Sequence, residues 1–150
     1  MAAFKKILFP CDLTENSTKL LPYVLMVSEK FNGMIYLLHV VEDLLRWGGF
    51  YVPHLNLNLL QEEIFEACER YIDQICETDL KGCPNFQRLV VSGDPAAEIL
   101  KTIAAEQIDL VIMGTHGRKG LEHTIFGSVA ENVVKQSPVP VMVINPYKLA

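Results

Sequence analysis

The residues best suited to binding a ligand lie between a hydrophobic segment at residues 109–113 and a later amphipathic segment. They are three glycines and a serine: Gly114, Gly117, Gly127 and Ser128. Glycine can adopt positive φ and lets the backbone approach an anion closely, and the N–H groups at a helix start attract negative charge. Arg118 and Lys119 add positive charge to the same connection. The pattern predicts a phosphate-binding loop that follows a buried strand.

The same glycines have a simpler explanation, because glycine often does no more than end a strand or cap a helix. Two glycines alone would favour that explanation, whereas four such features in order on one connection favour the phosphate loop. The first connection, residues 11–18, contains no glycine. A dinucleotide fingerprint and a GxxxxGK[ST] loop are therefore excluded there, and a flavodoxin-like electron carrier is disfavoured.

Short apolar runs indicate the strands that position this loop. We expect strands at residues 5–10, 35–41, 87–91, 109–113 and 139–144. The first two do not alternate cleanly between polar and apolar residues, which is typical of strands covered on both faces. Strands that alternate with helical segments predict a parallel α/β sheet with right-handed crossovers. Pro138 and Pro140 flank the start of the last strand, and proline lacks the N–H that a central strand must donate, so we expect this strand at a sheet edge.

Helical spacing fills the intervals between the strands. The first helix has an apolar face of Leu20, Val24, Val27 and Phe31. Gly33 is expected to cap its C-terminus, and Pro22 means that this helix either starts late or bends. The second helix has an apolar face of Leu60, Ile64, Cys68, Tyr71 and Ile75. Gly82 and Pro84 are expected to end it.

Two further helices follow. Asp94 is expected to be the N-cap of the third, with Pro95 in its first turn. Ile99 and Ile103 then face inward. The last helix is expected to start near Ser128.

Length and composition limit the classes of protein to consider. A chain of 150 residues that is 50% apolar fits one globular domain spanning residues 1–150. A net charge of −5 with scattered basic residues argues against a nucleic-acid partner. No segment approaches the ~20 apolar residues of a membrane span, and the N-terminal apolar run is too short for a signal peptide, so we expect a cytoplasmic protein and no membrane partner. The cysteines lack metal-binding spacing and are expected to be small buried residues.

In open parallel sheets, ligands bind beyond the carboxyl ends of the strands, where the strand order reverses. Pro10, Val40 and Gly114 stand at the ends of the first, second and fourth predicted strands, so they should converge on one crevice. Asp12 at this edge suits a ribose, an adenine amino group or a water on Mg²⁺. Its alternative role is an N-terminal helix cap.

The histidines and a group of aromatic residues leave alternatives open. His39 lies inside an apolar strand and is expected to be a hydrogen-bonded core residue. His116 and His123 stand in the glycine-rich connection, where each either contacts phosphate or has no role in binding. The aromatic stretch from Trp47 to Tyr51 is either a lid, a partner surface or ordinary packing. No Ser-His-Asp set, Cys-His set or pair of carboxylates has a spacing that indicates catalysis.

Together these motifs resemble the signature of one protein family. The run Gly114-x2-Gly117-x9-Gly127-Ser128 follows Asp-Leu-Val-Ile-Met and precedes Val-Ala-Glu-Asn-Val-Val-Lys-Gln-Ser-Pro-Val-Pro-Val. With Pro10-x-Asp12-x-Thr14 in the first connection, it resembles the nucleotide-binding branch of the universal stress protein family. The resemblance covers the entire sequence. It implies an adenine nucleotide alpha hydrolase-like, Rossmann-like fold, in which an open five-stranded parallel sheet has helices on both faces and the strand order 3-2-1-4-5.

The resemblance also implies a ligand and roles for individual residues. The ligand is an adenine nucleotide, ATP or AMP, and Mg²⁺ would enter through the bound nucleotide. Asp12 and Val40 would contact the adenosine part, with Met113 nearby. The ribose and phosphates would be surrounded by Gly114, Gly117, Gly127, Ser128 and Val129. Pro10 and Arg118 complete the expected binding residues.

The function implied is that of a stress-response regulator, a binding module whose nucleotide occupancy changes what it associates with. The alternative is a slow ATP hydrolase or phosphoryl-transfer protein, for which Asp12 and His116 are weak candidates. A homodimer through the fifth strand is expected, because an apolar strand at a sheet edge offers backbone groups to a second copy. The family resemblance implies the same dimer. Other protein partners are not indicated.

Overall fold

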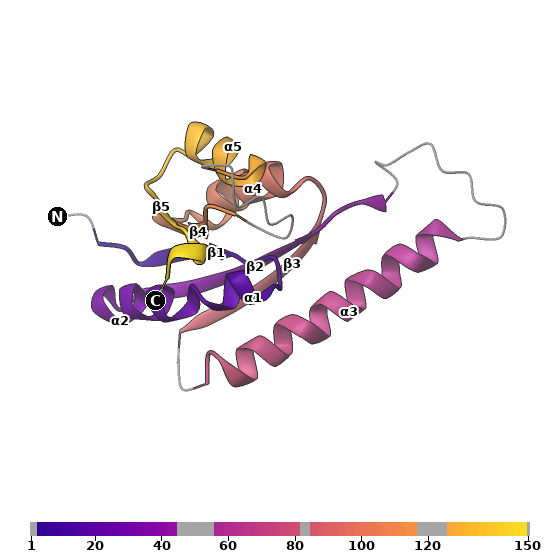
Figure 1. The fold of residues 1–150 in the computed structure, drawn as a ribbon, viewed down its shortest axis with the longest axis horizontal. Coiled ribbons are helices and arrows are strands. Elements are labelled where there is room, and N and C mark those ends of the chain that lie inside the picture. The colour runs from indigo at the N-terminus through magenta and orange to yellow at the C-terminus, as the bar shows by residue number, and fades with distance from the viewer. Residues whose placement is uncertain (1–2, 45–55, 82–84, 117–125, 150) are drawn as a thin grey trace.

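A computed structural model describes residues 3–44, 56–81, 85–116 and 126–149 of the protein. Its centre is a five-stranded parallel sheet in the order β3-β2-β1-β4-β5 (Figure 1). The strands are β1 Lys6–Pro10, β2 Met34–Val41, β3 Phe86–Ser92, β4 Leu110–Gly114 and β5 Val141–Ile144. The predicted fold class and strand order are confirmed, and β5 lies at an edge as its prolines predicted.

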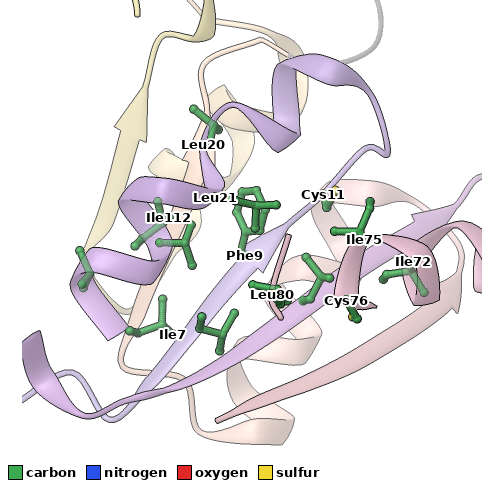
Figure 2. Packing of buried hydrophobic residues seen from close by; sticks show 14 of the residues in the cluster. Ile7, Phe9, Cys11, Leu20, Leu21, Ile72, Ile75, Cys76, Leu80 and Ile112 are labelled. Atoms are coloured by element: carbon green, nitrogen blue, oxygen red, sulfur yellow. The ribbon is translucent and has the colours of Figure 1, made fainter. Parts of the chain in front are cut away.

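Helices cover both faces of this sheet (Figure 1). They are α1 Glu15–Thr18, α2 Leu21–Phe31, α3 Leu57–Thr78, α4 Pro95–Glu106 and α5 Ser128–Gln136, and the 3₁₀ helix η2 Pro146–Lys148 follows β5. Figure 2 shows α2 and α3 packing their apolar residues against one face. The helices α4 and α5 pack on the other face. Ile7 and Phe9 of β1 belong to the apolar cluster on the α2 and α3 face, and Leu8 belongs to the cluster on the α4 and α5 face. A strand buried on both faces needs apolar residues at successive positions, which is why β1 and β2 do not alternate.

The helix α2 resolves the question that Pro22 posed. The helix starts at Leu21, so Pro22 lies in its first turn, where no N–H is required of it. The prediction of Gly33 as the C-terminal cap was wrong, because Asn32 holds the left-handed position with φ 49°. Gly33 is needed for another reason. A Cβ atom there would lie 2.4 Å from the Phe4 carbonyl oxygen, so only glycine fits.

The predictions for α3 and α4 had different outcomes. The buried residues of α3 are Ile72, Ile75 and Cys76, whereas the side chain of Tyr71 is 55% exposed. Tyr71 is one residue out of step with the face that the sheet covers, so its predicted inward orientation was wrong. In α4, Asp94 caps the helix as predicted, because its Oδ2 accepts a hydrogen bond of 3.0 Å from the Ala97 N–H.

The start of β1 is held by the side chain of Asp109, the residue just before the neighbouring strand β4. Oδ2 of Asp109 accepts hydrogen bonds of 2.9 Å from the N–H groups of both Lys5 and Lys6. We expect Asp109→Ala to lower the free energy of unfolding by about 1–2 kcal/mol, because two backbone donors lose a charged acceptor. Urea denaturation measures this change, with Glu29→Ala on the exposed face of α2 as a control that changes stability by less than about 0.5 kcal/mol. Equal stability of the two variants would contradict the prediction.

Candidate functional site

A pocket of about 470 Å³ lies at the carboxyl ends of β1, β2 and β4. This volume is within the range of roughly 300–1,000 Å³ that is usual for small-molecule sites. Eight residues predicted from the sequence line it: Pro10, Asp12, Val40, Met113, Gly114, Gly127, Ser128 and Val129. Gly117 and Arg118 lie outside the described residues, as do Lys119, His123 and the stretch from Trp47 to Tyr51. The structure thus brings together segments that are more than 70 residues apart in the sequence.

The pocket forms because β1 ends before its two neighbours. The Cys11 N–H donates to the Leu38 carbonyl over 2.7 Å, and the Gly93 N–H donates to the Val41 carbonyl over 3.0 Å. Backbone groups of a parallel strand alternate between its two neighbours, so Val40 directs its N–H and C=O toward the β1 side, as Leu38 does. Since β1 ends at Pro10, Val40 faces the space beyond that end.

The strand β4 presents its last residue to the same space. The N–H groups of Val111 and Thr115 donate to the carbonyls of Pro140 and Ile144 over 3.0 and 2.9 Å, so these two residues direct their backbone toward β5. Because the direction alternates along a parallel strand, Gly114 directs its backbone toward β1. Pro10 opposite carries no N–H, and the paired residues of β1 and β4 end at Leu8 and Val111. Backbone groups of two strands therefore face one crevice from opposite sides.

Asp12 organises the loop between β1 and α1. Its Oδ1 accepts hydrogen bonds from the Thr14 N–H at 2.9 Å, the Thr14 hydroxyl at 2.5 Å and the Ser17 hydroxyl at 2.5 Å. Thr14, not Asp12, is the N-cap residue of α1. Leu13 between them has φ 63°, a conformation that non-glycine residues adopt rarely. Asp12 therefore holds a tight turn at the wall of the pocket.

Gly114 and Gly127, the described glycines of the predicted phosphate loop, do not adopt positive φ, so the expectation of positive φ was wrong for these two residues. Gly127 has φ −69° and ψ 163°. A Cβ atom on Gly127 would lie 3.3 Å from the Thr115 carbonyl oxygen, and one on Gly114 would lie 3.1 Å from the His116 carbonyl oxygen. The Gly127 N–H also donates to the Thr115 carbonyl over 2.7 Å. These glycines allow the two ends of the loop to pack closely.

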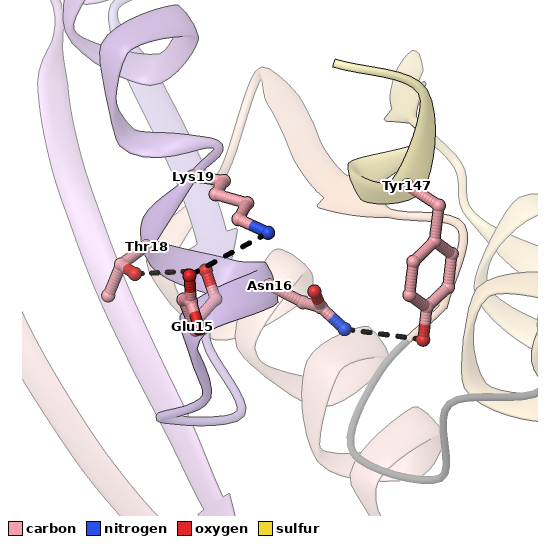
Figure 3. Close-up of polar contacts among 5 residues, drawn as sticks. All are labelled: Glu15, Asn16, Thr18, Lys19 and Tyr147. Carbon is pink, nitrogen blue, oxygen red and sulfur yellow. Dashed lines mark hydrogen bonds and ion pairs between the residues drawn. The ribbon is translucent and has the colours of Figure 1, made fainter. Parts of the chain in front are cut away.

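The side chain of Tyr147, in the C-terminal segment, contacts residues from two segments beside the pocket. Figure 3 shows Asn16 of α1 donating a hydrogen bond of 3.3 Å to the Tyr147 hydroxyl. The Tyr147 ring packs against His116, with ring centroids 5.4 Å apart. His116 is buried, and its Nδ1 lies 2.8 Å from the Thr115 hydroxyl. Sequence reasoning missed Tyr147, because a three-residue 3₁₀ helix has no hydrophobic period to reveal its inward side.

Other residues of the pocket come from the covering helices and from buried strand positions. Ile64 and Cys68 of α3 and Ile99 of α4 line it, and their helical spacing had indicated only that they face inward. His39 also lines it and is buried, with Nδ1 2.8 Å from the Cys11 carbonyl oxygen, which confirms a hydrogen-bonded core histidine. Within the described ranges, no group of three or more metal-ligating side chains could hold a metal ion, and no helix is long and apolar enough to cross a membrane.

Cys11 is buried at the floor of the pocket, as expected for its type. Burial raises the pKa of its thiol from 9.0 to about 11, while the Leu13 N–H opposes this shift and the Asp12 carboxylate adds to it. The thiol therefore stays protonated at neutral pH. A protonated thiol is a weak nucleophile, so Cys11 acts in the pocket as a small apolar residue.

The raised pKa predicts a loss of stability at high pH. Between pH 9 and 11 the folded protein keeps the Cys11 proton while the unfolded protein releases it. The contribution of the protonated thiol to the free energy of unfolding is therefore complete below pH 9 and is lost as pH rises toward 11. Between pH 8 and pH 11, we expect the free energy of unfolding to fall by about 2 kcal/mol more in the wild-type protein than in Cys11→Ala. Urea denaturation of both proteins at each pH measures this difference. Parallel losses in the two proteins would contradict the assigned shift.

Comparison with known proteins gives one consistent result. The profile of the universal stress protein family matches residues 3–145. Universal stress protein MJ0531 of Methanocaldococcus jannaschii is 31% identical over 148 residues, which is 97% of this protein and 84% of that one. The solved structure of MJ0577 from the same organism is 29% identical with a TM-score of 0.81, over 96% of this protein and 97% of that one. A universal stress protein solved in complex with cAMP shares the fold with a TM-score of 0.63 at 14% identity, over 97% of this protein and 99% of that one.

Proposed function

This protein belongs to the universal stress protein family, and from that membership we propose that it binds an adenine nucleotide, AMP or ATP, in the pocket beyond β1. The observation that carries the proposal is the placement of two kinds of group in one pocket. Backbone groups of Val40 suit the edge of a base, and the N-terminus of α5 suits a phosphate. A solved universal stress protein in complex with cAMP supports the same class of ligand.

The adenine specificity follows from the backbone groups of Val40. An adenine edge carries an amino donor beside a ring-nitrogen acceptor, which matches a backbone C=O beside a backbone N–H. Guanine presents the opposite order, an oxygen acceptor beside an N–H donor, and would place like groups against each other. Met113 and Ile99 contribute apolar walls to the same pocket. We infer that the base lies against Val40 between these walls.

The phosphate end lies at the start of α5, a helix of nine residues. Gly127 is its N-cap and has no side chain with which to satisfy the first N–H groups. Ser128 adds an exposed hydroxyl, and Val129 lines the pocket beside it. Unsatisfied N–H groups and the helix dipole together favour an anion here. Mg²⁺, where ATP is the ligand, would be held through the phosphates.

In this proposal the protein acts as a nucleotide-dependent regulator in the cytoplasm. Occupancy of the pocket would bias the loops around Asp12 and Thr115, which Asn16 and Tyr147 join to the C-terminal segment. A ligand changes such an arrangement only through its different affinity for the alternatives. Nucleotide binding would thus alter the surface offered to a partner.

We expect purified protein to bind AMP at least about tenfold more tightly than GMP, because guanine leaves the Val40 groups without complementary partners. Isothermal titration calorimetry with each mononucleotide measures the ratio of the two affinities. Mass spectrometry of ligand released from denatured, freshly purified protein identifies the resident nucleotide. Equal affinities for AMP and GMP, or no binding of AMP or ATP by folded protein, would overturn the proposed function.

A further inference from the structure

The Cys11 carbonyl stands where the next bond of the β1–β2 ladder would form. The Cys11 N–H donates to Leu38 over 2.7 Å, so a continued parallel ladder would have the Cys11 carbonyl accept from the Val40 N–H. That bond is not formed among the described residues. The carbonyl instead lies 2.8 Å from Nδ1 of His39. Because a carbonyl oxygen only accepts, the Nδ1 atom carries the proton and donates it.

His39 is well placed to hold this carbonyl. Its side chain is only 5% exposed and lines the same pocket as Cys11 and Val40. It belongs to β2, the strand that also carries Val40, so the donor and the group it competes with are neighbours in sequence. A buried carbonyl needs a hydrogen-bond donor, and β2 offers two to this one. Among the described residues, His39 contacts the carbonyl and the Val40 N–H does not bond to it.

We propose that His39 is a positioning residue that ends the β1–β2 ladder one bond early and so reserves the Val40 N–H and C=O for the base of the bound nucleotide. This role rests on the proposed function, since it names what prepares the base-binding edge. Without the imidazole, the Cys11 carbonyl would accept the Val40 N–H and close the ladder over the base-binding position. The pocket would then lose its donor to the base while the sheet gained a hydrogen bond.

Two substitutions separate this role from simple packing. In His39→Asn the side-chain amide nitrogen replaces Nδ1 as donor to the Cys11 carbonyl, whereas His39→Leu fills the space without a donor. We expect the leucine variant to bind AMP about tenfold more weakly. We also expect its preference for AMP over IMP to fall to near unity, because IMP reverses the donor and acceptor that Val40 reads. The asparagine variant should keep both properties within about threefold of wild type.

Amide hydrogen exchange gives a readout that needs no nucleotide. In the wild type the Val40 amide should exchange faster than that of Leu38, which pairs with β1. In His39→Leu the Val40 amide should become at least about tenfold more protected, and in His39→Asn it should not. A Val40 amide as protected in the wild type as in the leucine variant would overturn the positioning role, as would an unchanged AMP to IMP ratio in that variant. If the protection changes as expected while the wild type binds neither nucleotide, the ladder-ending role of His39 stands and the proposed nucleotide is wrong.

Discussion

Replacing Ser128 with glutamate is expected to weaken AMP binding by at least about thirtyfold while leaving adenosine affinity within about twofold of wild type. Ser128 is the first residue of α5 and is exposed at the pocket. A carboxylate there would lie beside the phosphate and repel it, and like charges about 4–5 Å apart near a protein surface interact by a few kcal/mol. Adenosine has no phosphate and would not meet this repulsion.

The neutral variant Ser128→Gln distinguishes the effect of charge on AMP binding from the effect of side-chain size. It should bind AMP within about threefold of wild type. Glutamate in the first turn of a helix stabilises it by about 0.3–1 kcal/mol, so the thermal midpoint of Ser128→Glu should not fall. Raised salt should narrow the difference between the two variants. Equal AMP affinities of the glutamate and glutamine variants would show that the phosphate does not bind at this helix.

We predict a homodimer that pairs through β5, and we expect the replacement of Val141 with proline to make the protein a monomer at micromolar concentration. The residues before and after it, Pro140 and Met142, direct their backbone groups toward β4, since the Pro140 carbonyl accepts from Val111. Val141 therefore directs its N–H away from the sheet, at the edge that β5 forms. Proline has no N–H, and a symmetric pair of β5 strands would lose this donor from both copies. We therefore expect the dissociation constant of the dimer to rise at least about 100-fold.

The two edges of the sheet differ in how well they suit pairing. Met142 of β5 is 40% exposed, and no charged residue lies in this strand. At the opposite edge, β3 carries Arg88, which pairs with Asp73 of α3 and adds charge to the edge. Charged side chains discourage edge pairing, whereas an exposed apolar edge invites it. We therefore expect the second copy on β5.

Sedimentation velocity measures the oligomeric state of these variants. The control is Arg88→Pro, which removes an outward N–H from β3 and should leave the dimer intact, because exposed ion pairs such as Arg88–Asp73 contribute little. Circular dichroism checks that both variants keep the sheet. A wild-type monomer at tens of micromolar would contradict the dimer, and an unchanged dimer in Val141→Pro would place the interface elsewhere.

Local sequence patterns determined most of the fold. Apolar runs of strand length, the helical spacing between them and the prolines before β5 each act within a few residues, so they predicted the alternation of elements and the edge position of β5. The cap at Asp94 was predictable for the same reason, since its acceptor and donor are three residues apart. The pocket residues at strand ends were also predictable, because parallel strands place their carboxyl ends together.

Tertiary structure alone decided the features that depend on a neighbour far along the sequence. Gly33 is required by the distant Phe4 carbonyl, and Tyr71 is exposed because the sheet covers the adjacent face of α3. The Tyr147 contact with Asn16 joins residues 131 positions apart, and no local pattern records it. The direction of the Val40 backbone follows from where β1 ends relative to β2, a matter of register between strands. Residue type and spacing specify which element forms, but which groups meet in the pocket depends on how the elements pack.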